Sequence, residues 1–298
     1  MAPDSTGAAY VASVVLALPF DKVARWTLRA LWAALPFTVG PALGDWLAGA
    51  SRPVQLVAAG GEWAAWAVGV LATAVPMPLT LTALRVLAPA VGAAAVATGS
   101  PLAIGWAVVT LGWAFSPSVG ALWVNGPAYP NERRYLLRAP GPLLFGPLAV
   151  AWAAAVAGVA AGPLLLAARS WVLGALLGAV GLPLAAVLLR GMHDLSRRWL
   201  VFVPAGIVLH DPLSVVDPVL LRRQTVTRVG PAPPGALDLT KKSPGLALEI
   251  ALDEEMELAL VKPGRRLGDP VRASRLLVTP TRPGAVVDEA RRRRLPVA

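Results

Sequence analysis

Two long stretches of the sequence are nearly free of charge, and they restrict the chain to folds that a lipid bilayer can hold. Residues 57–125 contain two charged side chains, Glu62 and Arg85, and residues 142–189 contain one, Arg169. Soluble proteins carry about 25% charged residues, whereas this chain carries 15% and is 56% hydrophobic. The sequence therefore predicts a polytopic integral membrane protein.

Five segments supply the roughly 20 apolar residues that a helix needs to cross the hydrocarbon core. They cover residues 54–75, 79–98, 101–124, 142–167 and 171–189. Basic residues follow the third and the fifth segments, so the positive-inside rule places residues 126–141 and the C-terminal part in the cytoplasm. We expect residues 54–190 to form an all-α bundle of about five transmembrane helices in the cell membrane.

The first 53 residues form a separate segment, and the sequence leaves its side of the membrane open. Residues 21–34 place one lysine and two arginines on a single stripe, which predicts an interfacial amphipathic helix. Five spans with a cytoplasmic C-terminus put the N-terminus outside, whereas a basic helix favours the cytoplasmic face. A sixth span within 7–20 or 31–50 would remove this conflict.

From about residue 195 the apolar residues alternate as they do in strands, and we expect residues 195–298 to fold alone as a cytoplasmic domain. Seven strands are predicted at 199–203, 207–210, 218–227, 236–240, 246–252, 256–262 and 274–279. A final helix is predicted with Thr281 as its N-cap. The acidic residues of 253–257 are interpreted as a solvated turn, because they lack the spacing of a calcium loop.

Seven short strands followed by one helix resemble the pleckstrin-homology-like (PH-like) fold of bacterial PH-type membrane proteins, over residues 199–294. The whole chain is similar to uncharacterised multi-pass membrane proteins of actinobacteria in the stretches SRPVQLVA, LTALRVLAPA, NERRYLLRAPGP and RWLVFVPAGIVLHDPLSVVDPVLLRRQ. That similarity implies no particular activity. PH domains that bind phosphoinositides carry basic residues around the first loop between strands. Here that loop is Pro204-Ala205-Gly206, which argues against a specific inositide site.

The two isolated charges of the predicted spans are candidate functional residues. Arg85 falls within two turns of the cytoplasmic end of its span, where it can snorkel to the interface; the alternative is a functional intramembrane charge. Glu62 is expected near the outer rim of the first span. Trp63 and Trp66 are also expected near a span end, where an indole ring suits the interface.

Two pairs of glycines predict close packing between helices. Gly158 and Gly162 lie four residues apart in the fourth predicted span, and Gly174 and Gly178 have the same spacing in the fifth. Small residues at this spacing let helix backbones approach closely in a membrane. The pairs favour packing of the fourth span on the fifth, and the alternative is an interface between copies of the chain.

Basic residues of the C-terminal domain offer a second candidate site. They are Arg197, Arg198, Arg222, Arg223, Lys241, Lys242, Lys262, Arg265 and Arg266. One interpretation is an ordinary charged surface, and the other is docking to anionic phospholipid headgroups of the inner leaflet. The net charge of +10 would also suit nucleic acid, but the apolar composition favours a lipid surface over nucleic acid.

No motif for catalysis, cofactor binding or metal binding emerges from the sequence. It contains no cysteine, two histidines, and no Walker A, H-E-x-x-H or G-x-S-x-G pattern. We therefore expect a non-enzymatic integral membrane protein, a scaffold or accessory subunit whose cytoplasmic domain binds protein or lipid. Its partner would be another membrane protein or a second copy. The alternative is a small membrane transporter that uses Arg85 and Glu62 along a polar pathway.

Overall fold

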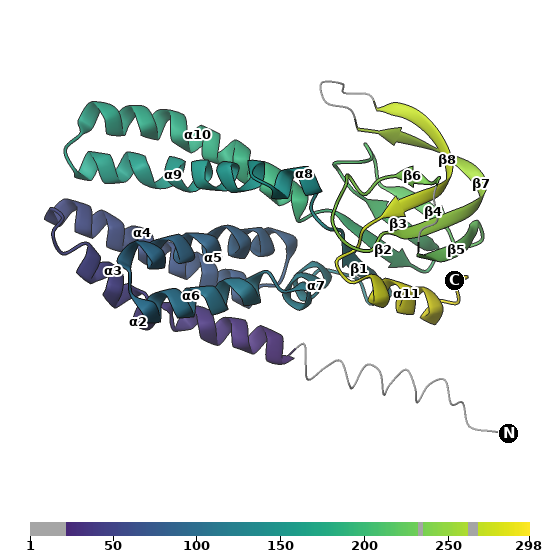
Figure 1. The fold of residues 1–298 in the computed structure, drawn as a ribbon, viewed down its shortest axis with the longest axis horizontal. Coiled ribbons are helices and arrows are strands. Elements are labelled where there is room, and N and C mark those ends of the chain that lie inside the picture. Colours follow the sequence, from purple (N-terminus) through teal and green to yellow (C-terminus); the bar gives the residue numbers. More distant parts are fainter. Residues whose placement is uncertain (1–21, 232–234, 262–267) are drawn as a thin grey trace. The chain divides into compact units, whose positions relative to one another are not determined.

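The structure is a computed structural model, and it describes residues 22–231, 235–261 and 268–298 (Figure 1). These residues form two compact units. The helical unit comprises the described residues up to Pro76 together with Ala83–Trp123, and the β unit comprises Met77–Thr82 together with Val124–Ala298. The predicted division into an apolar helical part and a β-rich C-terminal part is confirmed. The described residues contain four helices long and apolar enough to cross a membrane, or up to five if a bent pair counts as one span.

Several helices of the helical unit begin at a proline or a glycine. A helix over residues 22–33 is followed by α2 (Leu35–Thr38), α3 (Gly40–Trp46), α4 (Arg52–Ala74), α5 (Pro78–Thr98), α6 (Pro101–Ala114) and α7 (Pro117–Asn125). A proline in the first turn of α4 and of α6 loses no intrahelical hydrogen bond there. Ser100 caps α6 by accepting a hydrogen bond from the amide of Ala103.

The third predicted span, residues 101–124, is bent in the structure. The α6 and α7 helices meet at an angle of 53° across a short break. Pro117 begins α7, and a proline disfavours helical geometry in the residue before it and has no N–H to donate. The bend therefore follows from Pro117, and the apolar composition of the span alone does not predict it.

Residues 22–33 form a helix, as the sequence predicts for 21–34, and its location at a membrane interface stays a prediction. Leu28 is fully buried, and Trp32 is 1% exposed. The indole N–H groups of Trp106 and Trp113, both in α6, donate to the carbonyls of Leu31 and Ala24 at 2.9 Å. One face of this helix therefore packs into the helical unit, while Val23 and Trp26 on the other face are more than half exposed.

The contacts of this first helix also give its direction. Arg29 donates to the carbonyl of Thr73 in the last turn of α4 (Nε–O 3.1 Å), where unpaired carbonyls and the helix dipole favour a cation. At the other end of α4, the amide of Gln55 donates to three carbonyls, including those of Leu47 and Ala50. Residues 22–46 therefore run antiparallel to α4 along its length, which is about 35 Å.

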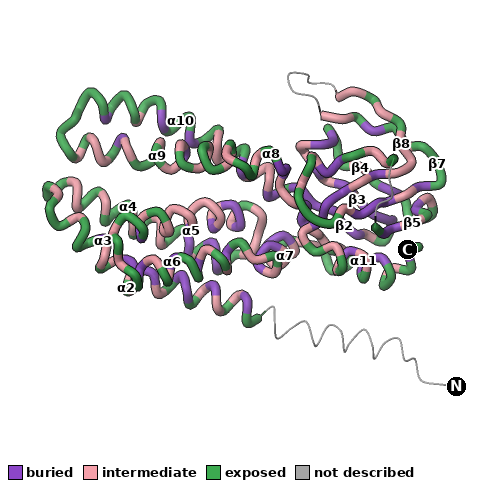
Figure 2. Tube along the Cα trace, viewed as in Figure 1, coloured by how far each residue is buried: buried purple, intermediate pink, exposed green. Residues whose placement is uncertain are grey.

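The β unit contains a long helical hairpin. Its helices are α8 (Gly141–Leu144), α9 (Pro147–Ala167) and α10 (Trp171–Leu195), and residues 168–170 join the two long ones. Figure 2 shows both long helices with mostly exposed and intermediate residues along their lengths. Large apolar side chains, among them Val150, Val172 and Leu176, are more than half exposed. The hairpin therefore has an apolar exterior.

The rest of the β unit is a domain of two four-stranded sheets and one helix. The strands are β1 (Arg133–Leu136), β2 (Trp199–Val203), β3 (Gly206–His210), β4 (Val219–Arg222), β5 (Val226–Pro231), β6 (Leu237–Asp238), β7 (Leu248–Leu260) and β8 (Asp269–Val278), and the helix is α11 (Pro283–Arg292). The sheet orders are β1-β2-β3-β4 and β5-β7-β8-β6. Phe202, Leu209 and Leu221 from the first sheet share one core with Ile250 and Leu276 from the second.

Strand β1 was not predicted, and it changes where the β domain begins. Its residues precede the hairpin, yet it pairs antiparallel with β2, in register from Arg133 opposite Phe202 to Leu136 opposite Trp199. Leu136 and Leu137 are 3% and 5% exposed. The predicted boundary at residue 195 therefore omits a strand, and the hairpin is an insertion between two neighbouring strands of one sheet.

The strands after residue 199 differ from their predicted divisions. The predicted strand 218–227 is two strands, β4 and β5, with a turn between them, while 246–252 and 256–262 form the single strand β7. The acidic residues of 253–257 lie on this strand at a register shift between Ala251 and Met256, so the predicted turn is a β-bulge. Thr281 lies before α11, whose N-cap is Arg282 and makes no side-chain cap bond.

Candidate functional site

The helical unit contains a cavity of about 900 Å³. Residues from Trp32 to Ala48 form one wall, and α4 and α5 form the others. The lining is apolar except for Arg52, Gln55 and Glu62. All three polar residues lie on α4, and the side-chain amide of Gln55 donates to three carbonyls of residues 47–50, in the turn that follows α3.

Two tryptophans fix the wall of the cavity between the first helix and α4. The indole N–H of Trp32 donates to the carbonyl of Trp66 (3.1 Å), and the indole N–H of Trp66 donates to the carbonyl of Trp32 (3.2 Å). Gly69 lies against the ring of Trp32, where a Cβ atom would overlap it. This reciprocal pair holds both rings without using their faces for hydrogen bonding.

Glu62 does not occupy the rim position that the sequence favoured. Helix α4 runs from Arg52 to Ala74, which puts Glu62 close to its middle, about 15 Å along the axis from Arg52. Its side chain is half-buried in the cavity lining. Trp63 and Trp66 are likewise near the middle of α4, so their expected location at a helix end is also wrong.

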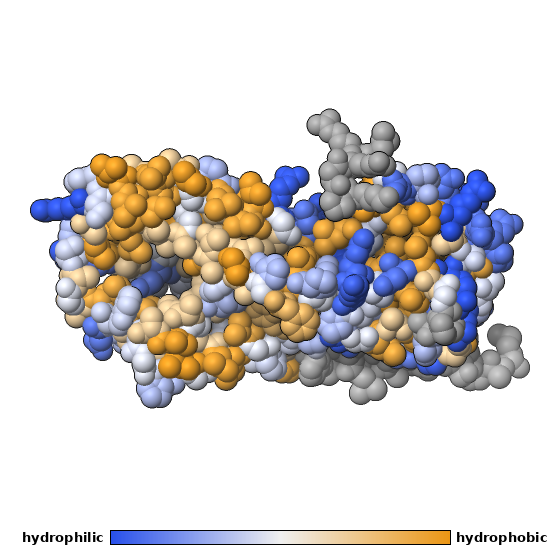
Figure 3. Space-filling view, turned by 45° about the horizontal axis from the view of Figure 1, so that its top comes forward, coloured by the Kyte–Doolittle hydropathy of each residue, from blue (hydrophilic) through white to orange (hydrophobic). Residues whose placement is uncertain are grey.

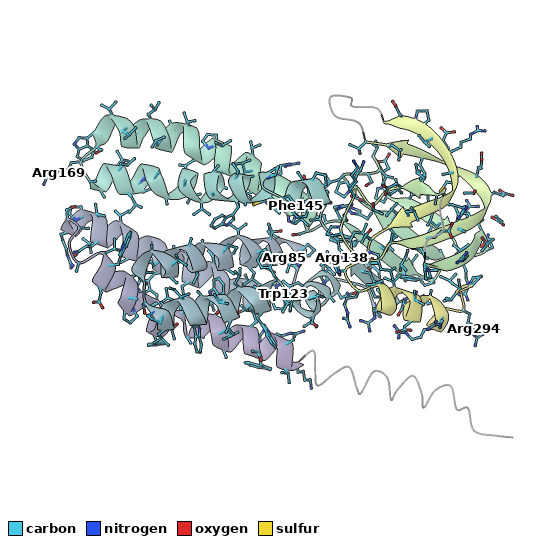
Figure 4. The ribbon with its side chains drawn as sticks, in the orientation of Figure 1. Arg85, Trp123, Arg138, Phe145, Arg169 and Arg294 are labelled. Atoms are coloured by element: carbon cyan, nitrogen blue, oxygen red, sulfur yellow. The ribbon has the colours of Figure 1, made fainter. Side chains whose placement is uncertain are left out.

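The structure does not bring Arg85 and Glu62 together. Arg85, on α5, is absent from the lining of the cavity that contains Glu62. Its guanidinium carbon lies 5.7 Å from the centroid of the Phe115 ring, and its Nε is buried without a hydrogen-bond partner. Figure 4 labels Arg85 together with Trp123, whose buried indole N–H donates to the carbonyl of Ala72 (3.0 Å). The cavity around Glu62 therefore contains one of the two charges named for the transporter alternative.

The predicted glycines lie where α9 packs on α10. A Cβ atom on Gly162 would come within 2.8 Å of the Cα of Gly178, and one on Gly158 would meet the backbone of Gly181. Gly174 faces the backbone and side chain of Leu166 in the same way. This is the arrangement that packing within one chain requires, and larger side chains at these positions would separate the helices.

Arg198 was assigned to a membrane-docking surface, and the structure corrects this. Arg198 is 1% exposed, and its Nε and Nη2 donate to the two carboxylate oxygens of Asp211, each at 2.7 Å. Its Nη1 donates to the carbonyl of Arg138 at 2.6 Å. Asp211 also accepts from the hydroxyl of Ser214. A buried charge of this kind is satisfied internally and is not available to a ligand.

The remaining basic candidates divide into two locations. Arg197 follows α10 directly, and Lys241 and Lys242 form a turn whose Lys242 carbonyl lies against Gly141 of α8. Arg222 and Arg223 lie instead beside the turn between β2 and β3, and Arg223 donates to the carbonyl of Arg293 at the end of α11 (2.6 Å). Lys262, Arg265 and Arg266 fall outside the described residues.

Figure 4 gives three markers along the β unit that separate these locations. Arg169 lies at the tip of the hairpin, Arg138 lies at its base, and Arg294 lies on the β domain away from the hairpin. Arg138 accepts a hydrogen bond from Ser243, next to Lys242, at 3.0 Å. The first group of basic residues therefore lies at the base of the hairpin, and the second lies near the end of α11.

A cluster around Glu289 attaches α11 to the sheet. Glu289 is 5% exposed and accepts from Arg292 and Arg293, and the hydroxyl of Tyr135 on β1 donates to it (3.3 Å). Burial alone would raise the pKa of Glu289, but the hydrogen bonds from the two arginines outweigh it and lower the pKa. Burial and the neighbouring carboxylate raise the pKa of the Tyr135 phenol.

No family model, curated protein or solved structure matches this chain. The candidate sites therefore depend on the geometry of the chain alone. Among residues 22–231, 235–261 and 268–298, no three histidines, cysteines or acids are grouped as metal ligands. Three structural features are candidate functional sites: the cavity around Glu62, the apolar surface of the hairpin, and the basic residues at the base of that hairpin.

Proposed function

We propose that this protein is an integral membrane scaffold or accessory subunit that holds a binding domain at the cytoplasmic surface. The observation that carries the proposal is the apolar exterior of the α9–α10 hairpin. Both helices are long and apolar enough to cross a membrane. Of the most apolar 18-residue stretch of each helix, only 11% is buried in α9 and 17% in α10. Figure 3 shows hydrophobic residues gathered over this hairpin and hydrophilic ones over much of the β domain. Water does not tolerate so large an apolar surface, whereas lipid does.

The insertion of the hairpin between β1 and β2 supports a scaffold in particular. Both ends of the hairpin enter the same sheet, so the chain crosses from membrane to domain twice within one unit. The amide of Leu137 donates to the carbonyl of Arg198 (2.9 Å), and the amide of Arg138 donates to the carbonyl of Thr279 (2.8 Å). A domain attached in this way has a fixed orientation relative to the hairpin, unlike one on a flexible linker.

A PH-like fold is the form that we propose for the binding domain. Two antiparallel sheets around one core and a C-terminal helix support it. The strand β1 from before the hairpin and the short parallel pair β6–β8 are departures from the expected pattern. The uncharged turn 204–206 argues for binding that is not specific for inositides. Fold alone does not define a ligand.

The base of the hairpin has the composition of a membrane-surface contact. Arg197 and Lys242 are exposed there, and Phe145, between α8 and α9, is 85% exposed. Anionic headgroups attract each basic residue near the surface by about 1 kcal/mol, and an aromatic ring suits the interface. We propose that these residues contact the inner leaflet, while Arg222 and Arg223 remain available to a protein partner.

A sixth membrane crossing over residues 22–46 completes the proposed topology. The segment is about as long as α4 and antiparallel to it, and its basic residues Lys22, Arg25 and Arg29 lie at the end near the C-terminus of α4. Its exposed Trp26 and Trp46 lie near its two ends. Six crossings from residue 22 onward put Lys22 and the C-terminal domain in the cytoplasm, which satisfies the positive-inside rule for the basic helix as well.

Single cysteines test this topology, because the native chain has none. Cysteines would replace Ser170 in the hairpin tip, Gln224 in the turn after β4 and Lys22, all of them exposed. A membrane-impermeant maleimide on intact cells should label Ser170→Cys and leave Gln224→Cys and Lys22→Cys protected until the cells are opened. Labelling of Lys22→Cys on intact cells would support five crossings instead. Labelling of Gln224→Cys, or release of the protein from membranes by alkaline carbonate, would contradict the proposed function.

A further inference from the structure

The cavity of the helical unit contains a carboxylate with no counter-charge. Within the described part of the chain, Glu62 makes no ion pair or hydrogen bond. Arg52 also lines the cavity, but it is exposed at the start of α4, about 15 Å along the axis from Glu62. An isolated acid in an apolar, membrane-embedded setting is costly, and it marks a functional position more often than a structural one.

Aromatic rings stand beside this carboxylate. Trp63 and Trp66 contact each other edge to face, with ring centroids 5.4 Å apart, and both line the cavity with Trp32. The N–H groups of Trp32 and Trp66 are already bonded to backbone carbonyls. Trp66 and the largely exposed Trp63 therefore offer a ligand their π surfaces, which attract cations and apolar groups, while Trp32 and Trp66 have no free N–H donor for an anion.

The size and lining of the cavity define the rest of the ligand. Ligand pockets span about 300 to 1,000 Å³ and are mostly apolar with a few placed polar groups, and this cavity of about 900 Å³ fits that description. Leu43, Leu56 and Leu87 are among its apolar lining residues. A ligand that fills it needs a large apolar body and a positive charge to pair with Glu62.

We propose that this cavity binds a lipophilic organic cation, with its apolar body against the leucines and its charge beside Glu62 and Trp63. The inference goes beyond the scaffold function, since it concerns the helical unit alone and makes no use of the β domain. An acyl chain would fill the same space but would leave the carboxylate unpaired. An anionic amphiphile would be repelled by it.

Equilibrium dialysis of radiolabelled tetraphenylphosphonium against the purified full chain in an uncharged detergent tests the proposal. We expect saturable binding of one cation per chain. Glu62→Gln keeps the shape of the side chain and should weaken binding at least about tenfold, because the charge attraction is lost. Asp45→Asn is the matched control: this exposed acid of α3 does not line the cavity, and its loss should leave binding unchanged. Trp63→Leu should weaken binding about fivefold.

Tetraphenylborate, which has the same shape and the opposite charge, separates charge recognition from apolar partition. It should bind more weakly than the cation to the native chain, and Glu62→Gln should strengthen its binding. Ala59→Phe, which fills the cavity from α4, should abolish cation binding even if the Glu62 variant fails to fold. Equal binding of the two ions, full affinity in Glu62→Gln, or no saturable binding would each overturn the proposal. The last result would indicate that lipid or another part of the chain occupies the cavity.

Discussion

The hairpin and the β domain belong to one compact unit, yet the hairpin exposes most of its large apolar side chains and the β domain buries them. Most of the α9–α10 surface is exposed, with Val172 86% and Val187 68% accessible, whereas Leu200, Phe202 and Ile207 in β2 and β3 are fully buried. The hydrophobic effect can hold the second region together, because folding removes its apolar groups from water. In the membrane location that we propose for the first region, this effect contributes little, because the apolar groups exchange one apolar environment for another.

The two regions also differ in the groups that make contact inside them. The β domain closes around a core of leucine, valine, isoleucine and phenylalanine from both sheets and α11. The hairpin closes through glycine backbones, with the Gly162–Gly178 and Gly158–Gly181 approaches at its centre. If the hairpin lies in lipid as we propose, dispersion between closely packed backbones replaces burial from water as the source of its stability. Substitutions should therefore act differently in the two regions.

Removal of β1 should have the largest effect, because it tests whether the β domain is independent of the hairpin. The excised residues 195–298 lose the pairing partner of β2 and the buried side chains of Leu136 and Leu137. Two such side chains are worth about 3 to 6 kcal/mol, enough to leave a small domain largely unfolded.

The comparison chain for that experiment restores the strand. Residues 128–140 joined through a Gly/Ser linker to residue 195 should recover a cooperative unfolding transition, measured by circular dichroism in urea. If the excised 195–298 unfolds with the same midpoint as the chain that contains β1, then the pairing of β1 with β2 contributes little and the boundary at 195 is adequate.

Substitution of the glycines between α9 and α10 should change the stability of the protein by an intermediate amount. Gly162→Ala places a methyl group against the backbone of Gly178, where neither helix can move without separating, and we expect a loss of about 1 to 3 kcal/mol. Gly191→Ala is the same change in α10 with nothing within 4 Å, and helix propensity should make it neutral or slightly stabilising. Unfolding of the full chain by sodium dodecyl sulfate titration measures both. Equal midpoints would mean that the glycine approach does not hold the hairpin.

The smallest expected effect is a dependence of β-domain stability on pH. The pKa of Glu289 is lower in the folded protein than its ordinary value, so its charged form favours folding. That stabilisation is complete above about pH 4.3, the ordinary pKa of a glutamate, and is lost as pH falls through the lowered folded value. Glu132 has a lowered pKa for a similar reason, since hydrogen bonds from Arg134 and the Tyr129 amide outweigh its burial.

The measurement for this prediction compares acid titrations of two chains. Glu289→Gln should flatten the acid limb of the stability curve, while the exposed Glu254→Gln should leave it unchanged. The hairpin contains no acid with such a contact, so its detergent stability should not follow the same curve. An acid limb that persists in Glu289→Gln would assign the pH dependence to other carboxylates.

The sequence predicted the elements that are defined by residues close together in the chain. The strands β2 and β3 were found from alternation around a tight turn, and the glycine pairs were found from their spacing. The strand β1 was missed, because it is only four residues long and begins with two arginines, which were interpreted as part of a basic loop that sets the topology. Their pairing partner lies beyond the hairpin, and no local pattern contains that information.

The error at Arg198 could have been avoided from the sequence. Val203 pairs with Gly206 across the turn, and the same antiparallel register puts Trp199 opposite His210. One step further it puts Arg198 opposite Asp211, an arginine facing an acid. The cavity around Glu62 was beyond such reasoning, since it depends on the packing of residues 32–48 against α4 and α5.

The position of the hairpin between β1 and β2 has a consequence for biosynthesis. The ribosome makes β1 first, then the hairpin, and only then β2, at about 5 to 20 residues per second. During that interval β1 has no partner, and under the proposed topology its pairing with β2 requires the two ends of the hairpin to meet on one side of the bilayer. Completion of the sheet therefore reports that both α9 and α10 have been inserted. A chain with a misplaced hairpin would keep an open edge strand, which quality-control proteases and chaperones can recognise.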